Sequence, residues 1–264
     1  MACHFFKFTL FLLLMRNILC LITALLLSAS FIANAKEVSK EITFQACPQF
    51  FVAELSPRVP DVSALKGRPL CYEAFAVLHS GVTKTPLFVA ERLNKEQLDD
   101  AKGEKRTNRF FADARLPFSE RAQLEDYKHS GWSRGHMAPA ADMATAQAMA
   151  QSFSLANIVP QAPVNNQKAW AGIEKATRKY VMRAQGDVYV ITGPIFDASS
   201  QTIGTGSVRV PKYLYKLVYD ATTNRAWAHW IENTDDARAD RPISYGELVR
   251  RTGIEFLPGA RAGE

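Results

Sequence analysis

The sequence lacks internal repeats, low-complexity tracts and any break in composition that would mark a second domain. These absences favour one mixed α+β domain over residues 36–264. The chain is long enough for a full hydrophobic core, and its contents of apolar (47%) and charged (22%) residues are ordinary, which excludes general disorder. The formal net charge of +6 favours a polyanionic partner.

Charged residues are scarce in the first 35 positions, where Lys7 and Arg16 are the only ones. Residues 18–32 are mostly apolar and lead to Ala33-Asn34-Ala35, a small-x-small site. This pattern predicts that residues 1–35 are a cleaved secretory signal peptide and that the protein is periplasmic or secreted, with no stable membrane association afterwards. An uncleaved membrane anchor is the alternative. Separately, Met15 is a more typical start of translation than Met1. Cleavage would leave a net charge of 6 − 2 = +4.

Cysteine is also scarce, with four residues in the chain. Cleavage would remove Cys3 and Cys20 and leave Cys47 and Cys71. Two cysteines in an exported chain predict one disulfide, which would close a loop of about 25 residues and stabilise the fold by roughly 3 kcal/mol. Two buried free thiols are the alternative.

Apolar periodicity predicts a mixture of strands and helices. Two strands joined by a hairpin are expected over Pro69–Leu78 and Thr85–Leu93. Helices are expected over Thr145–Phe153, about Asn166–Arg183 and Ser244–Arg251, the last with Ser244 and Glu247 as a capping box. Further strands are expected over Val188–Phe196, Val208–Pro211, Tyr213–Tyr219 and Ala226–Ile231.

Three blocks in fixed order carry the chemistry. The first is Ser133-Arg134-Gly135-His136, the second is Asn157-Ile158-Val159-Pro160-Gln161, and the third places Trp170 and Glu174 after Asn166. Together they resemble the DNA/RNA non-specific endonucleases, a ββα-metal family whose signature reads Asp-Arg-Gly-His, then Asn, then Glu. The resemblance spans residues 69–233 and implies a central antiparallel sheet flanked by helices.

The resemblance implies that His136 is the general base, because an imidazole titrates near neutral pH. A purely structural histidine is the alternative. Asn166 is implied as a metal ligand, since the family spacing to Glu174 is eight residues and so selects Asn166 over Asn165. An N-cap role for Asn166 stays open.

Glu174 follows Asn166 by two helical turns, with Trp170 between them. At 100° per residue of α-helix, the three side chains fall within about 80° of arc and share one side. The resemblance assigns Glu174 to the metal site. An exposed glutamate paired with Lys175 or Arg178 is the alternative.

Basic residues mark the expected contacts with phosphate. The run from Lys102 to Arg115 indicates either a phosphate-contacting edge or a solvated loop. Arg106 is expected to stabilise charge in the transition state. Arg109 is the competing candidate for that role and is expected to contact the substrate. Arg134 is expected to act on phosphate or to anchor its loop. Ser133 is expected to contact the substrate. It replaces the Asp of the family signature and adds no charge there. A Ser-Arg-Gly-His signature is familiar from the exonuclease-G-like branch of the family.

These residues predict an exported nuclease that uses Mg²⁺, or Mn²⁺, to hydrolyse DNA and RNA and leave 5′-phosphates. A non-catalytic nucleic-acid-binding module on the same scaffold is the second hypothesis. A third hypothesis, a hydrolase with Ser133 as nucleophile, is disfavoured because the sequence has no Gly-x-Ser-x-Gly elbow. Asn157 and Gln161 are expected to support the site, and Asp142 is a candidate neighbour. A homodimer and a proteinaceous inhibitor are left open as partners.

Overall fold

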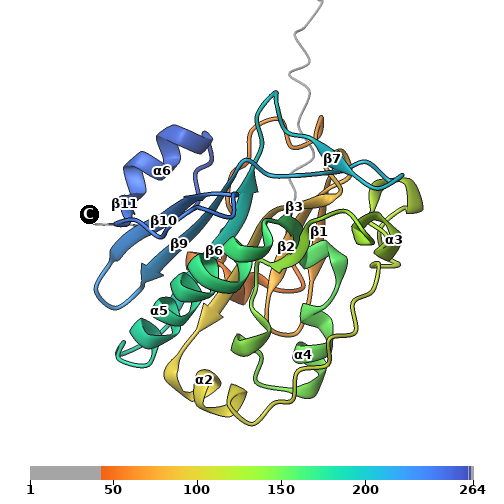
Figure 1. Cartoon of the computed structure of the whole chain (residues 1–264). Coiled ribbons are helices and arrows are strands. Elements are labelled where there is room, and N and C mark those ends of the chain that lie inside the picture. Colours follow the sequence, from red (N-terminus) through yellow and green to blue (C-terminus); the bar gives the residue numbers. More distant parts are fainter. Residues whose placement is uncertain (1–42, 261, 263–264) are drawn as a thin grey trace, which may run out of the picture. The chain divides into compact units, whose positions relative to one another are not determined.

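The computed structural model describes residues 43–260 and 262, all within one compact unit. The predicted signal peptide lies outside the described residues. Seven antiparallel strands form the central sheet, in the order β1-β2-β3-β6-β9-β10-β11 (Figure 1). Their bounds are Gly67–Cys71, Ala76–Ser80, Thr85–Leu93, Val188–Ile195, Tyr213–Asp220, Arg225–Glu232 and Ile243–Ser244. The predicted α+β fold with a central antiparallel sheet is confirmed.

Two small strand pairs lie outside this sheet. One joins β4 (Ser133–His136) to β5 (Ile158–Gln161), and the other joins β7 (Thr202–Ile203) to β8 (Val208–Arg209). The β4–β5 pair was not predicted, because four-residue strands rich in glycine, proline and polar residues carry no apolar alternation. It holds the signature histidine.

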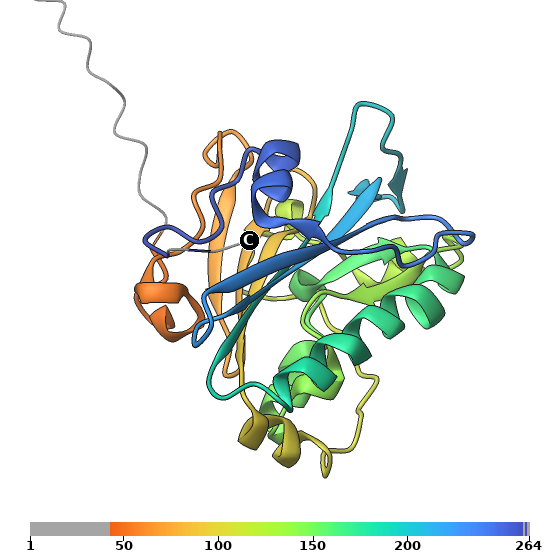
Figure 2. The same cartoon turned by 90° about the vertical axis from the view of Figure 1, so that its left-hand side faces the viewer.

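Helices cover both faces of the sheet (Figure 2). The α-helices are α2 (Lys95–Ala101), α3 (Leu124–Tyr127), α4 (Ala146–Ser152), α5 (Ala171–Val181) and α6 (Tyr245–Thr252). Single 3₁₀ turns occupy Pro48–Phe50, Val52–Glu54, Phe118–Glu120, Ala140–Asp142 and Leu155–Asn157. None of the helices within the described residues is long and apolar enough to cross a membrane.

The two faces of the sheet contribute to separate cores. On β3, Val89 packs in the cluster that contains Ile173 of α5, whereas the neighbouring Phe88 packs in the cluster that contains Leu248 of α6. Successive strand residues point to opposite faces, so β3 serves both cores. The α5 face is the one that carries the signature residues.

The expected single strand over Pro69–Leu78 is wrong, because the chain reverses there. Cys71 pairs with Ala76, and the Tyr72 N–H donates to the Phe75 carbonyl at 2.9 Å. This turn contains neither glycine nor proline, so its sequence looks like continuous strand. The rings of Tyr72 and Phe75 stack with centroids 4.4 Å apart, which holds the turn closed.

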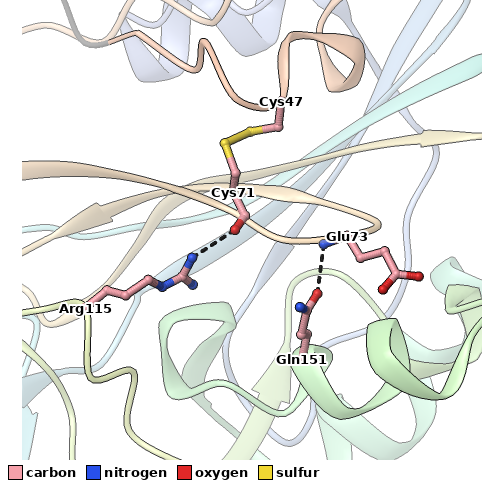
Figure 3. Close-up of a disulfide and its surroundings, with 5 residues drawn as sticks. All are labelled: Cys47, Cys71, Glu73, Arg115 and Gln151. Atoms are coloured by element: carbon pink, nitrogen blue, oxygen red, sulfur yellow. Dashed lines mark hydrogen bonds between the residues drawn. A yellow bond between two sulfur atoms is a disulfide. The ribbon is translucent and has the colours of Figure 1, made fainter.

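The predicted disulfide is confirmed (Figure 3). Cys47 and Cys71 have Cα atoms 5.7 Å apart, and their bond ties the N-terminal turns to the end of β1. The Cys71 carbonyl accepts a hydrogen bond from Arg115 Nη1, and the Glu73 N–H donates to Gln151 Oε1 of α4 (Figure 3). The disulfide therefore fixes the hairpin that α4 packs against.

The C-terminal helix begins as predicted, with Ser244 Oγ accepting the N–H of Glu247 at 3.1 Å. The second half of the predicted capping box does not form, because the Glu247 carboxylate pairs with Arg250 and Arg251. Ser244 therefore caps α6 alone.

Candidate active site

The β4–β5 pair presents His136 at its end, opposite Ile158. Directly after it, the backbone of Ala138 is held by Asn157, whose Oδ1 accepts the Ala138 N–H and whose Nδ2 donates to the Ala138 carbonyl, both at 2.9 Å. Asn157 is fully buried, and its own carbonyl accepts the Met137 N–H. Three hydrogen bonds thus fix the chain that follows the histidine, and Asn157 supports the site without facing solvent.

Gly135 is required by close packing against Gln161. A Cβ at this position would lie 2.0 Å from Gln161 Oε1, and Gly135 does not have a positive φ. Gln161 Nε2 in turn donates to Asn165 Oδ1 at 3.0 Å, and Asn165 Nδ2 donates to the Glu232 carbonyl at 2.8 Å. Glycine therefore lets the signature strand approach the chain of amides that leads to the next helix.

Ser133 and His136 lie on opposite faces of β4. Cross-strand partners share a face, and Ser133 pairs with Gln161, whose side chain also meets the Gly135 position. Arg134 and His136 therefore project from the other face. The Ser133 side chain therefore lies on the face of β4 opposite to His136.

His136 is enclosed by aromatic rings. It is 7% exposed, and its ring centroid lies 5.5 Å from that of Phe110 and 5.0 Å from that of Phe153. Its Nε2 has no hydrogen-bond partner among the described residues. Desolvation, with the charges of Arg106 and Arg134, lowers the pKa of His136 to about 3. The imidazole is therefore neutral at physiological pH.

Two exposed arginines extend over the aromatic cage. The Cζ of Arg106 lies 4.9 Å from the ring centre of Phe153, and that of Arg134 lies 4.2 Å from the ring centre of Phe110. Arg109 is exposed and makes no hydrogen bond or ion pair within the part of the chain described. The structure thus brings Arg106 and Arg134 over the rings around His136, whereas Arg109 makes no cation–π contact with those rings among the described residues.

The helix after β5 opens with a π-helical turn, Asn165–Trp170, which runs into α5. The wider turn invalidates the predicted 80° arc, which assumed α-helical geometry from Asn166 onwards. Trp170 is fully buried and its Nε1 donates to the His136 carbonyl at 3.4 Å, while Asn166 and Glu174 are half-buried. Trp170 therefore packs against the His136 backbone, and Asn166 and Glu174 keep part of their surface exposed.

The two neighbouring asparagines have different surroundings. Both ends of the Asn165 amide are used within the fold, whereas the Asn166 side chain makes no hydrogen bond to any described residue. Asn166 is also inside the π turn, so it is no N-cap. The free amide of Asn166 is thus the one available to a ligand.

Glu174 borders a layer of charged side chains that includes Asp142, Arg178 and Lys216. Desolvation raises the pKa of Glu174 to about 7, with Lys216 opposing this shift and Asp142 adding to it. Arg178 pairs with Asp142 at 2.9 Å, and no ion pair of Glu174 is found within the described residues. The alternative of an exposed glutamate paired with Lys175 or Arg178 is not what the structure shows.

Sequence reasoning missed the deepest members of this layer. Lys216 is 1% exposed, with its Nζ 2.7 Å from Thr192 Oγ1 and 5.4 Å from the Trp170 ring centre. Glu91 is also 1% exposed, and neither carboxylate oxygen has a partner among the described residues. Lys216 is the one charge in the interior of the apolar β9, and Glu91 precedes Arg92 near the end of the apolar β3, so a charge within an apolar strand was the available signal.

Asn166 and Glu174 fit a hard divalent cation. Both offer oxygen donors, the Asn166 amide is unpartnered among the described residues, and cation binding would compensate the desolvated Glu174 carboxyl. No group of three or more His, Cys, Asp or Glu residues within the described chain is arranged to hold a metal. A cation here would keep several water ligands, as Mg²⁺ does.

A histidine on a short strand pair, beside a helix that carries an asparagine and a glutamate, defines a ββα-metal site. The family model described as DNA/RNA non-specific endonuclease matches residues 58–262, and the chain therefore belongs to that family.

Curated relatives agree with this assignment. "Nuclease EXOG, mitochondrial" of Homo sapiens is 36% identical over 202 residues, which cover 66% of this chain and 54% of that protein. The Danio rerio protein of that name is 40% identical over 197 residues, covering 66% of this chain and 56% of that protein. "Endonuclease G, mitochondrial" of Homo sapiens is 36% identical over 227 residues, covering 78% and 74%. The chain spans just over half the length of the two EXOG relatives.

A solved structure shares the fold. It is titled "Crystal structure of the EndoG/EndoGI complex: Mechanism of EndoG inhibition", with a TM-score of 0.66, 21% identity, and coverage of 83% of this chain and 92% of that chain.

The expected periplasmic or secreted location is contradicted, because these close relatives are named as mitochondrial nucleases. The N-terminal pattern cannot by itself distinguish the two destinations. Basic, acid-poor N-terminal segments are shared by secretory signals and organelle-targeting peptides, and two charges among 35 residues do not separate them.

Proposed function

We propose that this chain is a Mg²⁺-dependent nuclease, able to use Mn²⁺, that hydrolyses phosphodiester bonds of DNA and RNA and leaves 5′-phosphates. The observation that carries this proposal is the neutral, caged His136, with an unpartnered Nε2 and two arginines extending over its cage. Family membership supports the reaction class.

His136 is the general base in this proposal. With its pKa lowered to about 3, it is unprotonated near neutral pH and accepts the proton of the attacking water at Nε2. Trp170 holds the His136 carbonyl, and the Asn157 hydrogen bonds hold the backbone that follows it. The strand pair thus orients the base before substrate arrives.

Asn166 and Glu174 would hold the cation. When bound, it would neutralise phosphate charge and act as a Lewis acid. Arg106 and Arg134 bind the phosphate on the side of the histidine, where a planar guanidinium forks onto two oxygens. Because phosphate contacts carry no base information, this site predicts cleavage with little sequence preference.

Closed circular DNA provides the test, incubated with Mg²⁺ or with EDTA. We expect Mg²⁺-dependent nicking by the protein and none by His136→Ala. Intact circles beside shortened linear DNA would instead indicate an exonuclease. Binding without cleavage of either form, under Mg²⁺ or Mn²⁺, would refute the enzyme and favour the nucleic-acid-binding module.

Nuclease activity should also fall with salt, because cationic contacts release counterions on binding. Rates that stay flat from about 50 to 200 mM salt would contradict a phosphate-binding surface. By analogy with the titled inhibitor complex of the solved structure, a proteinaceous inhibitor is a further partner in this proposal.

A further inference from the structure

Two segments far apart in the sequence carry the rings that enclose His136. Phe110 lies in the irregular chain after α2, Phe153 caps the end of α4, and their ring centroids are 4.9 Å apart. A backbone bridge joins the two segments. The Phe111 N–H donates to the Phe153 carbonyl at 3.2 Å, and the Leu155 N–H donates to the Phe111 carbonyl at 2.8 Å. The cage around His136 therefore depends on how this bridge is held.

Asp113 follows the bridge in the chain and is 4% exposed. Its Oδ2 accepts hydrogen bonds from the Tyr72 hydroxyl at 2.5 Å and from the Ser154 hydroxyl, on the other side of the bridge, at 3.3 Å. Arg115 donates Nε to Oδ1 at 2.9 Å and Nη2 to Oδ2 at 2.7 Å. Burial desolvates this carboxyl, but the hydrogen bonds from Arg115 and Tyr72 outweigh that effect and lower the pKa of Asp113 to about 2. Asp113 is therefore ionised, and ionised acceptors form the stronger hydrogen bonds.

Arg115 and Tyr72 connect Asp113 to the turn between β1 and β2. Arg115 Nη1 donates to the Cys71 carbonyl at 2.9 Å (Figure 3). The Cζ of Arg115 also lies 4.4 Å from the ring centre of Tyr72. The disulfide between Cys47 and Cys71 cross-links this turn to the N-terminal part of the domain. Asp113 thus ties the bridge to a part of the fold that is covalently fixed.

Arg106 lies in the segment that precedes the bridge. Among the described residues, positions 105–110 form no hydrogen bond to the rest of the chain, and Arg106 Nε donates within the segment, to Asn108 Oδ1 at 2.7 Å. The Arg106 guanidinium instead contacts the ring of Phe153. Its position therefore depends on that ring and on the bridge that follows in the chain.

We propose that Asp113 is a positioning residue for the nuclease reaction, which holds the rings of Phe110 and Phe153 against His136 and keeps Arg106 over them. It acts through the backbone bridge and through Ser154. Displacing reacting groups by about 1 Å can cost roughly 100-fold in rate, so an anchor of this kind affects turnover as well as stability. This inference rests on the proposed nuclease function and adds the residue that keeps its base and its arginine in place.

Asp220 provides a matched control away from the site. It is also buried, its Oδ2 accepts the Tyr180 hydroxyl at 2.6 Å, and its Oδ1 accepts the N–H groups of Thr222 and Thr223. Both aspartates therefore combine a tyrosine hydroxyl with further donors, whereas Asp113 alone is joined to the rings around His136.

The test compares Asp113→Asn with Asp220→Asn in single-turnover cleavage. Asparagine keeps the shape of aspartate, removes its charge and turns one acceptor into a donor. Asp113→Asn should lower kcat roughly 10- to 100-fold and change KM less than about threefold, whereas Asp220→Asn should keep kcat within about twofold. Equal losses of kcat in the two variants, at a temperature where both are folded, would overturn the proposal.

The His136 imidazole gives a readout that does not require turnover. NMR of its ring nitrogens at about pH 5.5 should show a neutral ring in the unmodified protein and in Asp220→Asn, because the cage excludes water. In Asp113→Asn, water entering the loosened cage should let the ring become charged, since the ordinary pKa of histidine is about 6.5. Arg106 and Arg134, the charges that act on His136, are unchanged in sequence in all three proteins. A ring that stays neutral in Asp113→Asn would contradict the anchor.

Tyr72→Phe and Tyr180→Phe are milder variants for the case in which Asp113→Asn does not fold. Tyr72→Phe removes one hydrogen bond from Asp113 and should lower kcat about threefold, whereas Tyr180→Phe should leave it unchanged. If the unmodified protein cleaves DNA and these two variants are equally active, the inference about Asp113 alone fails. If the unmodified protein cleaves no substrate, the proposed function fails, and the NMR comparison still decides whether Asp113 holds the cage.

Discussion

The two halves of the site have different neighbours. Around His136 the neighbours are the rings of Phe110 and Phe153, whereas beside Glu174 they are the charged Lys216 and Asp142. Burial lowers the pKa of the histidine to about 3 and raises that of the glutamate to about 7. Both groups are thus shifted toward their neutral forms. This leaves the histidine unprotonated at neutral pH, whereas the glutamate needs a cation to ionise fully.

The largest expected effect follows from removing the base. His136→Ala should lower kcat roughly 100- to 10,000-fold, the usual contribution of general acid–base catalysis. Oligonucleotide affinity should be unchanged, since Arg106 and Arg134 remain. Single-turnover cleavage under saturating enzyme measures this, and a loss below about tenfold would show that another group takes the proton.

Removing the positive charge of the buried Lys216 should destabilise the fold around Glu174. Lys216→Met removes the positive charge from among buried acids and should cost about 3 kcal/mol of unfolding free energy, as measured in urea. Glu91→Gln in that background should recover part of the loss, since it neutralises the most deeply buried carboxylate. A double variant no more stable than Lys216→Met would contradict coupling between these residues.

The arginines provide a matched comparison on the histidine half. Arg106→Lys should lower kcat/KM by about 10- to 100-fold, because lysine cannot fork onto two phosphate oxygens. Arg109→Lys should change it less than about threefold, since Arg109 makes no cation–π contact with the cage rings among the described residues. The reverse order would move the transition-state arginine to position 109.

The smallest expected effect is on the pH dependence of stability. It has opposite signs for His136 and Glu174. The lowered pKa of His136 means that the unfolded chain binds more protons between about pH 3 and 6.5, which costs stability at low pH. The raised pKa of Glu174 adds stability at low pH, which is lost as pH rises through about 7. Relative to the unmodified protein in EDTA, His136→Ala should therefore gain stability at pH 5 compared with pH 8, and Glu174→Gln at pH 8 compared with pH 5. Urea unfolding at both values checks the signs, and shifts of the same sign would refute the contrast.

Sequence analysis predicts much of the fold, because long apolar strands and the Ser244 cap carry local signals. It cannot predict the β1–β2 turn, whose Tyr72-Glu73-Ala74-Phe75 sequence has no turn residue, nor the π turn at Asn165–Trp170. Both are imposed by packing against distant residues. The residues brought to the site are therefore better predicted than the backbone that presents them.

The candidate site shows the same division. The signature blocks identify His136, Asn166 and Glu174 as candidates, while the choice between Arg106 and Arg109 depends on a contact with Phe153 that spacing does not encode. Lys216 and Glu91 were missed, since their strands pair in the sheet far from the signature in sequence. Their roles depend on tertiary contacts alone.

The pH dependence of kcat/KM at two Mg²⁺ concentrations tests the central contrast most directly. If Glu174 must ionise to bind the cation while His136 is already neutral, the acidic limb lies near pH 7 at low Mg²⁺ and moves to lower pH by about one unit for a tenfold increase. A limb fixed near 6.5 at both concentrations would indicate an ordinary histidine titration and contradict the account.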